Sequence, residues 1–158
     1  MAPSSNNLTL PSDLEIAMTR VFNAPRELVW KALTDPEAIP QWWGPRYLTT
    51  VVDKMDVRVG GAWRYVQHDP DGNEHAFNGV YKEIVPPERL VYTFEFEPMP
   101  GHIVVDHVTL DEVEGKTRVT VTSRFDSVED RDGTLNSGME GGATESWDRL
   151  AELLAEMA

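Results

Sequence analysis

Asp106 is the side chain in this sequence with the clearest potential for chemistry. It lies in the stretch Ile103–Leu110, where Val104, Val108 and Leu110 recur at the two-residue period of a half-buried β-strand. If the alternation holds, the carboxylate shares their apolar face. A buried, unpaired carboxylate has a raised pKa and could hold a ligand hydroxyl or transfer a proton. The alternative is that Asp106 lies near solvent at the open end of its strand or pairs with an arginine.

A group of aromatic residues on neighbouring stretches would surround this carboxylate. These rings could stack on a flat ligand, or they could fill the space themselves. In one stretch the inward face is ambiguous, because Phe77 and Tyr81 share one face whereas Val80 and Ile84 share the other. Ser123 follows the alternation of an apolar strand and is expected to point inward. The candidate pocket residues on the strands are Trp63, Tyr65, Phe77, Tyr81, Tyr92, Phe94, Phe96, Asp106 and Ser123.

Two further groups of residues would close the pocket. Trp42 and Trp43 precede a Gly-Pro break, and two interpretations are open: an aromatic lip over the pocket mouth, or a pair of core anchors. Met139, Ala143 and Trp147 lie on one apolar stripe of the last helical segment. We expect that stripe to face the strands and to contribute to the pocket.

Signatures of catalysis and of metal binding are absent from the sequence. It contains no nucleophile elbow, phosphate loop, dinucleotide fingerprint or zinc motif. It also has no cysteine, which excludes disulfides and thiolate chemistry. Asp69, Asp71 and Asn73 resemble a calcium loop, but the glycine stands at the wrong place in it, so a hairpin turn is the better interpretation. We therefore expect no metal, no cofactor and no catalytic residue, and a binding protein rather than an enzyme.

The composition narrows the class of partner. The net charge is −13, with 27 acidic residues against 14 Lys plus Arg, which disfavours nucleic acid and anionic membrane surfaces. No apolar run approaches the roughly 20 residues needed to insert into a bilayer. The expected partner is a small hydrophobic molecule, and a homodimer is left open. The absence of cysteine and of a signal peptide fits the cytoplasm.

Turn signals divide the chain of 158 residues into elements that would position these groups. Residues 1–13 are expected to be a flexible tail, and residues 14–158 a single domain. A strand from Leu14 precedes two short helices, and a long amphipathic helix that contains Gly138, Gly141 and Gly142 ends the chain. This order predicts an α+β fold, in which a seven-stranded, curved antiparallel sheet wraps around the C-terminal helix. The six strands between the helices are expected at Thr49–Val57, Ala62–Gln67, His75–Val85, Leu90–Glu97, Ile103–Leu110 and Thr117–Phe125.

Several motifs, in their order along the chain, resemble a known family. The sequence is similar to the SRPBCC superfamily, in its heat-shock protein 90 ATPase activator-like branch, from about Leu14 to Met157. The resemblance implies the START-like (helix-grip) fold and a cavity for a small hydrophobic ligand between the sheet and the last helix. Because related branches include polyketide cyclases and the branch is named for a co-chaperone, two alternatives remain open: a cyclase- or hydrolase-like enzyme on an aromatic or polyketide-type substrate, and a co-chaperone-like regulator of the heat-shock protein 90 ATPase. The motifs are Phe22–Trp30, Thr34–Pro36, Gln41–Pro45, Arg58–Trp63, Gly79–Tyr81, Val85–Val91, Gly138–Gly142 and Glu145–Leu150.

Overall fold

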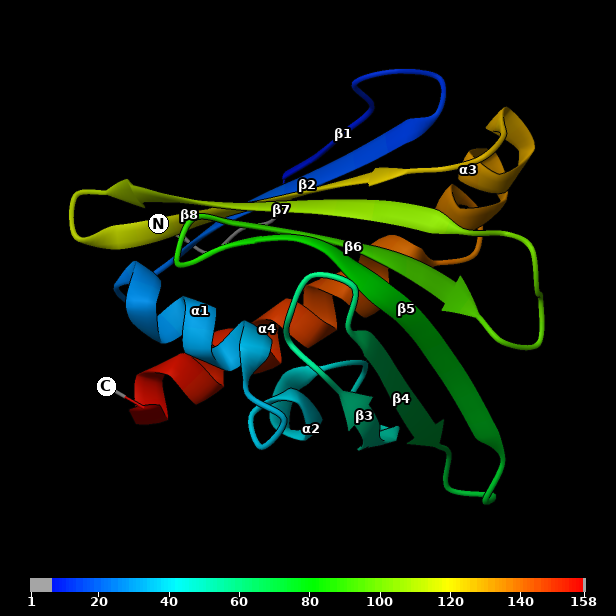
Figure 1. Ribbon diagram of the computed structural model, residues 1–158, viewed down its shortest axis with the longest axis horizontal. Helices are drawn as coiled ribbons and strands as arrows, with labels where there is room; N and C mark the ends of the chain where they lie inside the picture. Colours follow the sequence, from blue (N-terminus) through cyan, green and yellow to red (C-terminus); the bar gives the residue numbers. More distant parts are fainter. Residues whose placement is uncertain (1–6, 158) are drawn as a thin grey trace.

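The framework of the protein is one curved antiparallel sheet of eight strands, as seen in a computed structural model that describes residues 7–157 (Figure 1). The strand order is β1-β2-β8-β7-β6-β5-β4-β3. Strands β3 to β8 follow one another as neighbours, and β2 pairs with β8, so the beginning of the chain joins its last strand. The strands are β1 (Asn7–Thr9), β2 (Glu15–Phe22), β3 (Thr49–Met55), β4 (Ala62–His68), β5 (Glu74–Val85), β6 (Arg89–Phe96), β7 (Val104–Val113) and β8 (Lys116–Arg124).

The expected α+β class is confirmed, but the sheet has eight strands instead of seven. The additional strand, β1, lies in the segment expected to be a flexible tail, where Asn7 pairs with Thr19 and Thr9 with Ala17. Three residues are too few for an alternating pattern to be recognised, so the sequence carried no signal for this strand. The first part of the expected tail, residues 1–6, lies outside the described residues.

The helices are α1 (Arg26–Thr34), α2 (Ile39–Trp42), α3 (Val128–Leu135) and α4 (Met139–Met157). Figure 1 shows α1, α2 and α4 on the same side of the sheet, the side toward which β3 to β5 bend. Within residues 7–157 no helix combines the length and the apolar character needed to cross a lipid bilayer. Helices α1, α2 and α4 form the second layer of the fold and cover one face of the sheet.

The single long C-terminal helix expected from the sequence is two helices. Ser127 caps α3: its Oγ accepts the backbone N–H of Asp130 at 3.1 Å. Gly138, expected inside the helix, separates α3 from α4 with a φ of +85°. Glycine adopts this left-handed conformation without a steric penalty. Gly141 and Gly142 lie in the first turn of α4.

A β-bulge explains the ambiguous face of β5. The pairing with β6 shifts register between Tyr81 and Glu83. A bulge inserts one residue and reverses the alternation beyond it. Phe77 and Tyr81 before the bulge and Ile84 after it therefore lie on the same, inward face, whereas Val80 is 40% exposed.

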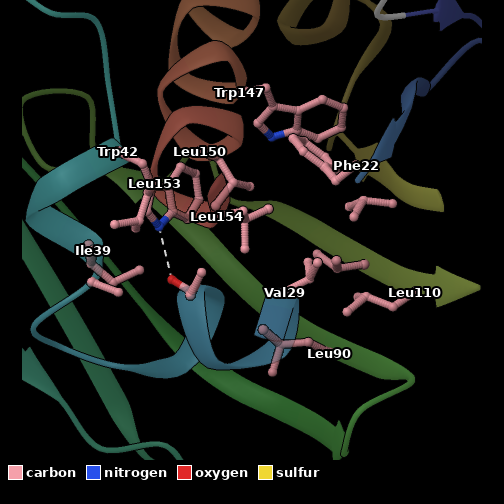
Figure 2. Packing of buried hydrophobic residues seen from close by; sticks show 14 of the residues in the cluster. Phe22, Val29, Ile39, Trp42, Leu90, Leu110, Trp147, Leu150, Leu153 and Leu154 are labelled. Atoms are coloured by element: carbon pink, nitrogen blue, oxygen red, sulfur yellow. Dashed lines mark hydrogen bonds between the residues drawn. The ribbon is translucent and has the colours of Figure 1, made fainter. Parts of the chain in front are cut away.

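A core of buried apolar residues lies between α1, α2, α4 and the sheet (Figure 2). Leu150 of α4 is fully buried, and Trp147 meets Phe22 of β2 edge-to-face with 5.7 Å between ring centroids. The indole N–H of Trp42 donates to the carbonyl oxygen of Ala32 at 2.9 Å, the dashed line in Figure 2. This bond joins α1 to α2 and satisfies the only polar atom of a buried indole.

Candidate ligand-binding site

Three adjoining cavities lie between the sheet and the helices that cover it: α1 and α2 border the first, and α4 borders the other two. We call them the inner, outer and helix cavities, with volumes of about 160, 450 and 190 Å³. Their walls are mainly aromatic and aliphatic, and they share several lining residues. Residues that distinguish them are Trp63, Tyr65 and Tyr81 for the inner cavity, Phe77, Val104 and Phe125 for the outer cavity, and Met18, Val121 and Trp147 for the helix cavity.

Trp43 lies where the three cavities meet, because it lines all of them. Its ring packs edge-on against Tyr65 and Phe77, with centroid distances of 5.0 and 5.2 Å. The side chain is only half-buried, whereas Trp42 is 6% exposed and holds α2 to α1. Each of the two interpretations therefore fits one tryptophan: Trp42 is a core anchor, and Trp43 borders the cavities.

The segment that carries Trp43 is fixed by two polar side chains of α4. The Oγ of Ser146 donates to the carbonyl oxygen of Trp42 at 3.0 Å and accepts the N–H of Gly44 at 3.1 Å. The guanidinium of Arg149 donates to the carbonyl oxygen of Gly44 at 2.8 Å. Helix α4, more than a hundred residues away in the chain, therefore supplies hydrogen-bond partners to the backbone groups around Gly44. These groups would otherwise lack partners.

We expect Ser146→Ala to lower the free energy of unfolding by about 1–3 kcal/mol, because it leaves the backbone groups of Trp42 and Gly44 without this partner in a buried place. Urea denaturation measures the loss. The matched control is Ser137→Ala, since the Ser137 hydroxyl donates to a carbonyl in an exposed turn; it should change stability by less than about 0.5 kcal/mol. Equal effects of the two substitutions would contradict the anchoring role of Ser146.

Asp106 is buried and lines both the inner and the outer cavity. It lies opposite Ser123 of β8, whose Oγ donates to Oδ1 of the carboxylate at 2.5 Å. Within the described part of the chain, Ser123 is its one hydrogen-bond partner and no arginine pairs with it. Burial raises the pKa of Asp106 to about 6, against the opposing effect of the Ser123 hydrogen bond. Of the two interpretations, the inward-facing carboxylate is the one that the structure supports.

Three tyrosines around the inner cavity remain neutral hydroxyl groups. Burial raises the pKa of Tyr81 to about 12, and it raises those of Tyr65 and Tyr92 well above the usual value. The hydroxyl of Tyr65 donates to the sulfur of Met55 at 3.7 Å. The cavity walls thus combine neutral hydroxyls with one carboxyl group.

Most of the candidate pocket residues border at least one cavity, and Phe96 is the exception. Phe96 stacks on Phe77 with 5.1 Å between ring centroids, and it lines none of the three cavities. Phe96 is the last residue of β6, and its ring contacts the Phe77 ring instead of bordering a cavity itself. The candidates that line a cavity are Trp42, Trp43, Trp63, Tyr65, Phe77, Tyr81, Tyr92, Phe94, Asp106, Ser123, Met139, Ala143 and Trp147.

Gln67 and Ser146 are among the polar residues of the outer cavity that sequence reasoning missed. Gln67 follows Trp63 and Tyr65 at the two-residue spacing of β4, and it is 4% exposed. Ser146 lies three residues after Ala143 on the same face of α4. In both cases the period places a polar side chain on an apolar face, which is the signal that could have found it.

The segment that resembles a calcium loop is a hairpin turn between β4 and β5. The Asp69 carboxylate accepts the backbone N–H groups of Asp71 and Asn73, both at 2.9 Å. Its oxygens are therefore used by the turn itself. In residues 7–157 no group of three His, Cys, Asp or Glu side chains is placed to hold a metal ion.

Comparison with known proteins identifies the family. The family described as "Activator of Hsp90 ATPase homolog 1-like protein" matches residues 23–155. The chain belongs to this family. The resemblance to the SRPBCC superfamily seen in the sequence motifs is thereby confirmed. No protein of curated function matches the chain.

Solved structures share the complete fold of this family member. A protein from Rhodobacter sphaeroides is 26% identical, with a TM-score of 0.91 over 96% of this chain and 99% of that chain. A protein from Arthrobacter aurescens is 26% identical, with a TM-score of 0.87 over 96% and 91%. The AHSA1 protein from Silicibacter pomeroyi is 23% identical, with a TM-score of 0.75 over 91% and 99%, a likeness that shows the fold alone.

Proposed function

We propose that this member of the activator of Hsp90 ATPase homolog 1-like family binds a small, largely apolar molecule between the sheet and α4. One observation carries the proposal: three adjoining cavities surround the buried pair of Asp106 and Ser123. Ligand pockets are typically concave, about 300–1,000 Å³ in volume, and apolar with a few placed polar groups. The outer cavity, at about 450 Å³, falls within that range.

Packing among the aromatic side chains supports the proposal, because space remains after these rings have packed against one another. Trp43, Phe77 and Phe94 contact each other with centroid distances of 5.2, 5.4 and 6.5 Å. All three nevertheless line the outer cavity. The recess that these rings leave is open to solvent and lined mainly by apolar side chains, which favours an apolar occupant.

The proposal predicts that Ala143→Trp blocks binding. Ala143 lines the outer and helix cavities, and an indole at this position would occupy their volume. A fluorescence titration with the neutral probe N-phenyl-1-naphthylamine should show at least about tenfold weaker binding than to the wild-type protein, with Ala143→Leu intermediate. Native mass spectrometry of the purified protein would look for a co-purified molecule in the same cavities.

The matched control is Ala155→Trp, the same substitution at an exposed position of the same helix. It should bind the probe as the wild-type protein does. Circular dichroism establishes that each variant is folded at the temperature of the titration. Equal affinities of Ala143→Trp and Ala155→Trp, or no binding of the probe by the wild-type protein, would overturn the proposal.

A further inference from the structure

We propose that the cavities select a cationic amine, whose ammonium group is held by Asp106 and whose apolar body lies among the aromatic rings. This inference rests on the proposed binding function and specifies the chemical class of its ligand. It is carried by the charges that line the cavities, by the hydrogen bonds of Asp106 and by the rings next to that carboxylate.

The first observation concerns charge. Among the described residues that line the three cavities there is no lysine, arginine, histidine or glutamate, and Asp106 is the one aspartate. A fatty acid or another anion would bring a second negative charge into an apolar space without a cation to meet it, which is costly. The net charge of −13 also favours the approach of cations over anions. The ligand group next to Asp106 is therefore a neutral hydrogen-bond donor or a cation.

The second observation concerns the two oxygens of the carboxylate. Oδ1 of Asp106 accepts from the Ser123 hydroxyl, whereas Oδ2 has no hydrogen-bond partner among residues 7–157. A buried carboxylate with one hydrogen bond is incompletely compensated. An ammonium group supplies N–H donors together with the opposite charge, and charge-assisted hydrogen bonds are stronger than neutral ones. A ligand alcohol would supply the donor without the charge.

The third observation concerns the rings beside the carboxylate. Trp43, Tyr92 and Phe94 line the inner cavity together with Asp106, and Tyr92 lies directly opposite Asp106 on β6. The faces of aromatic rings attract cations through their quadrupole, and the effect is larger where water is excluded. Carboxylate and rings together therefore favour an ammonium over an alcohol of the same shape.

Displacement of N-phenyl-1-naphthylamine by three probes of matched size tests the inference. The probes are 2-naphthylmethylamine, 2-naphthylmethanol and 2-naphthoate, which differ in the charge of one group. We expect the amine to bind about tenfold more tightly than the alcohol, and the acid to bind most weakly. In Asp106→Asn, the amine should lose this advantage, while the affinity for the alcohol changes less than about threefold.

Lowering the pH gives a second test that needs no variant. At about pH 5 the Asp106 carboxyl, whose pKa burial raises to about 6, is mostly protonated, so the amine should lose its advantage relative to about pH 7.5. Tyr92 on β6 and Tyr65 and Tyr81 on neighbouring strands stay neutral over this range, because burial raises the pKa of each. From β8 and α4, the groups that face the cavities are the uncharged Ser123 and apolar or hydroxyl side chains.

The outcomes separate this inference from the binding function. If the alcohol binds as tightly as the amine, or if the preference for the amine survives both Asp106→Asn and low pH, the inference is overturned while cavity binding stands. If neither the fluorescent probe nor any naphthalene compound binds, both proposals are overturned.

Discussion

Asp106→Asn should raise the free energy of unfolding near neutral pH by up to about 3 kcal/mol. The physical reason is desolvation: the charged carboxylate lies in an apolar space with one hydrogen bond, from Ser123. Asparagine keeps an oxygen that can accept this hydrogen bond and carries no charge. The gain is largest where the wild-type carboxylate is ionised in both the folded and the unfolded protein.

The sign of the pH dependence follows from the direction of the pKa shift. The folded protein binds the Asp106 proton more tightly than the unfolded chain, with a pKa of about 6 against an ordinary value of 3.8. Ionisation of Asp106 therefore destabilises the wild-type protein progressively as the pH rises from 3.8 to about 6. Above this range the destabilisation is complete, and below it there is none. The advantage of Asp106→Asn should grow by this amount across the same interval.

Urea denaturation of both proteins at about pH 5 and about pH 7.5 measures the difference, in which the pH effects of all other carboxylates cancel. The control is Glu112→Gln, an exposed substitution of the same kind on the same strand, which should change stability by less than about 0.5 kcal/mol. A variant that is no more stable relative to wild type at the higher pH than at the lower one would show that Asp106 is not desolvated.

Gly79→Ala should destabilise the protein by about 2–4 kcal/mol. A Cβ at this position would lie 1.8 Å from the carbonyl oxygen of Thr93 and 2.5 Å from the indole nitrogen of Trp63. The Trp63 N–H donates to the same carbonyl at 3.2 Å. The added methyl group therefore forces β5 and β6 apart and displaces an indole that lines the inner cavity. Binding of N-phenyl-1-naphthylamine should weaken together with stability.

The matched control is Gly141→Ala in the first turn of α4, where a Cβ meets nothing within 4 Å. Because alanine has the higher helix propensity, this variant should gain up to about 1 kcal/mol. Urea denaturation followed by tryptophan fluorescence compares the two substitutions. A stability loss at Gly79 no larger than about 0.5 kcal/mol would mean that the strands do not approach as closely as described.

Local patterns in the sequence predicted most elements, because each depends on residues a few positions apart. The alternation of Trp63 and Tyr65 placed β4, and the apolar stripe of Met139, Ala143 and Trp147 indicated the helix that contains them, α4. Two local features of the structure departed from such patterns. The bulge after Tyr81 exchanged the faces of β5, and the positive φ of Gly138 interrupted an otherwise helical segment. One-residue events of this kind leave the surrounding periodicity intact and are hard to recognise in it.

The sequence by itself determined the α+β class, the family and the inward side of most strands, since these follow from periodicity and from motifs in order. Only the tertiary structure decided that Asp106 has no cationic partner within residues 7–157, and that Ser146 and Arg149 hold the segment of Trp43 in place. Which groups far apart in the chain meet depends on the whole arrangement of sheet and helices. The tertiary structure also determined the cavities, because their volume is the space that remains between the sheet and the helices after every side chain has packed.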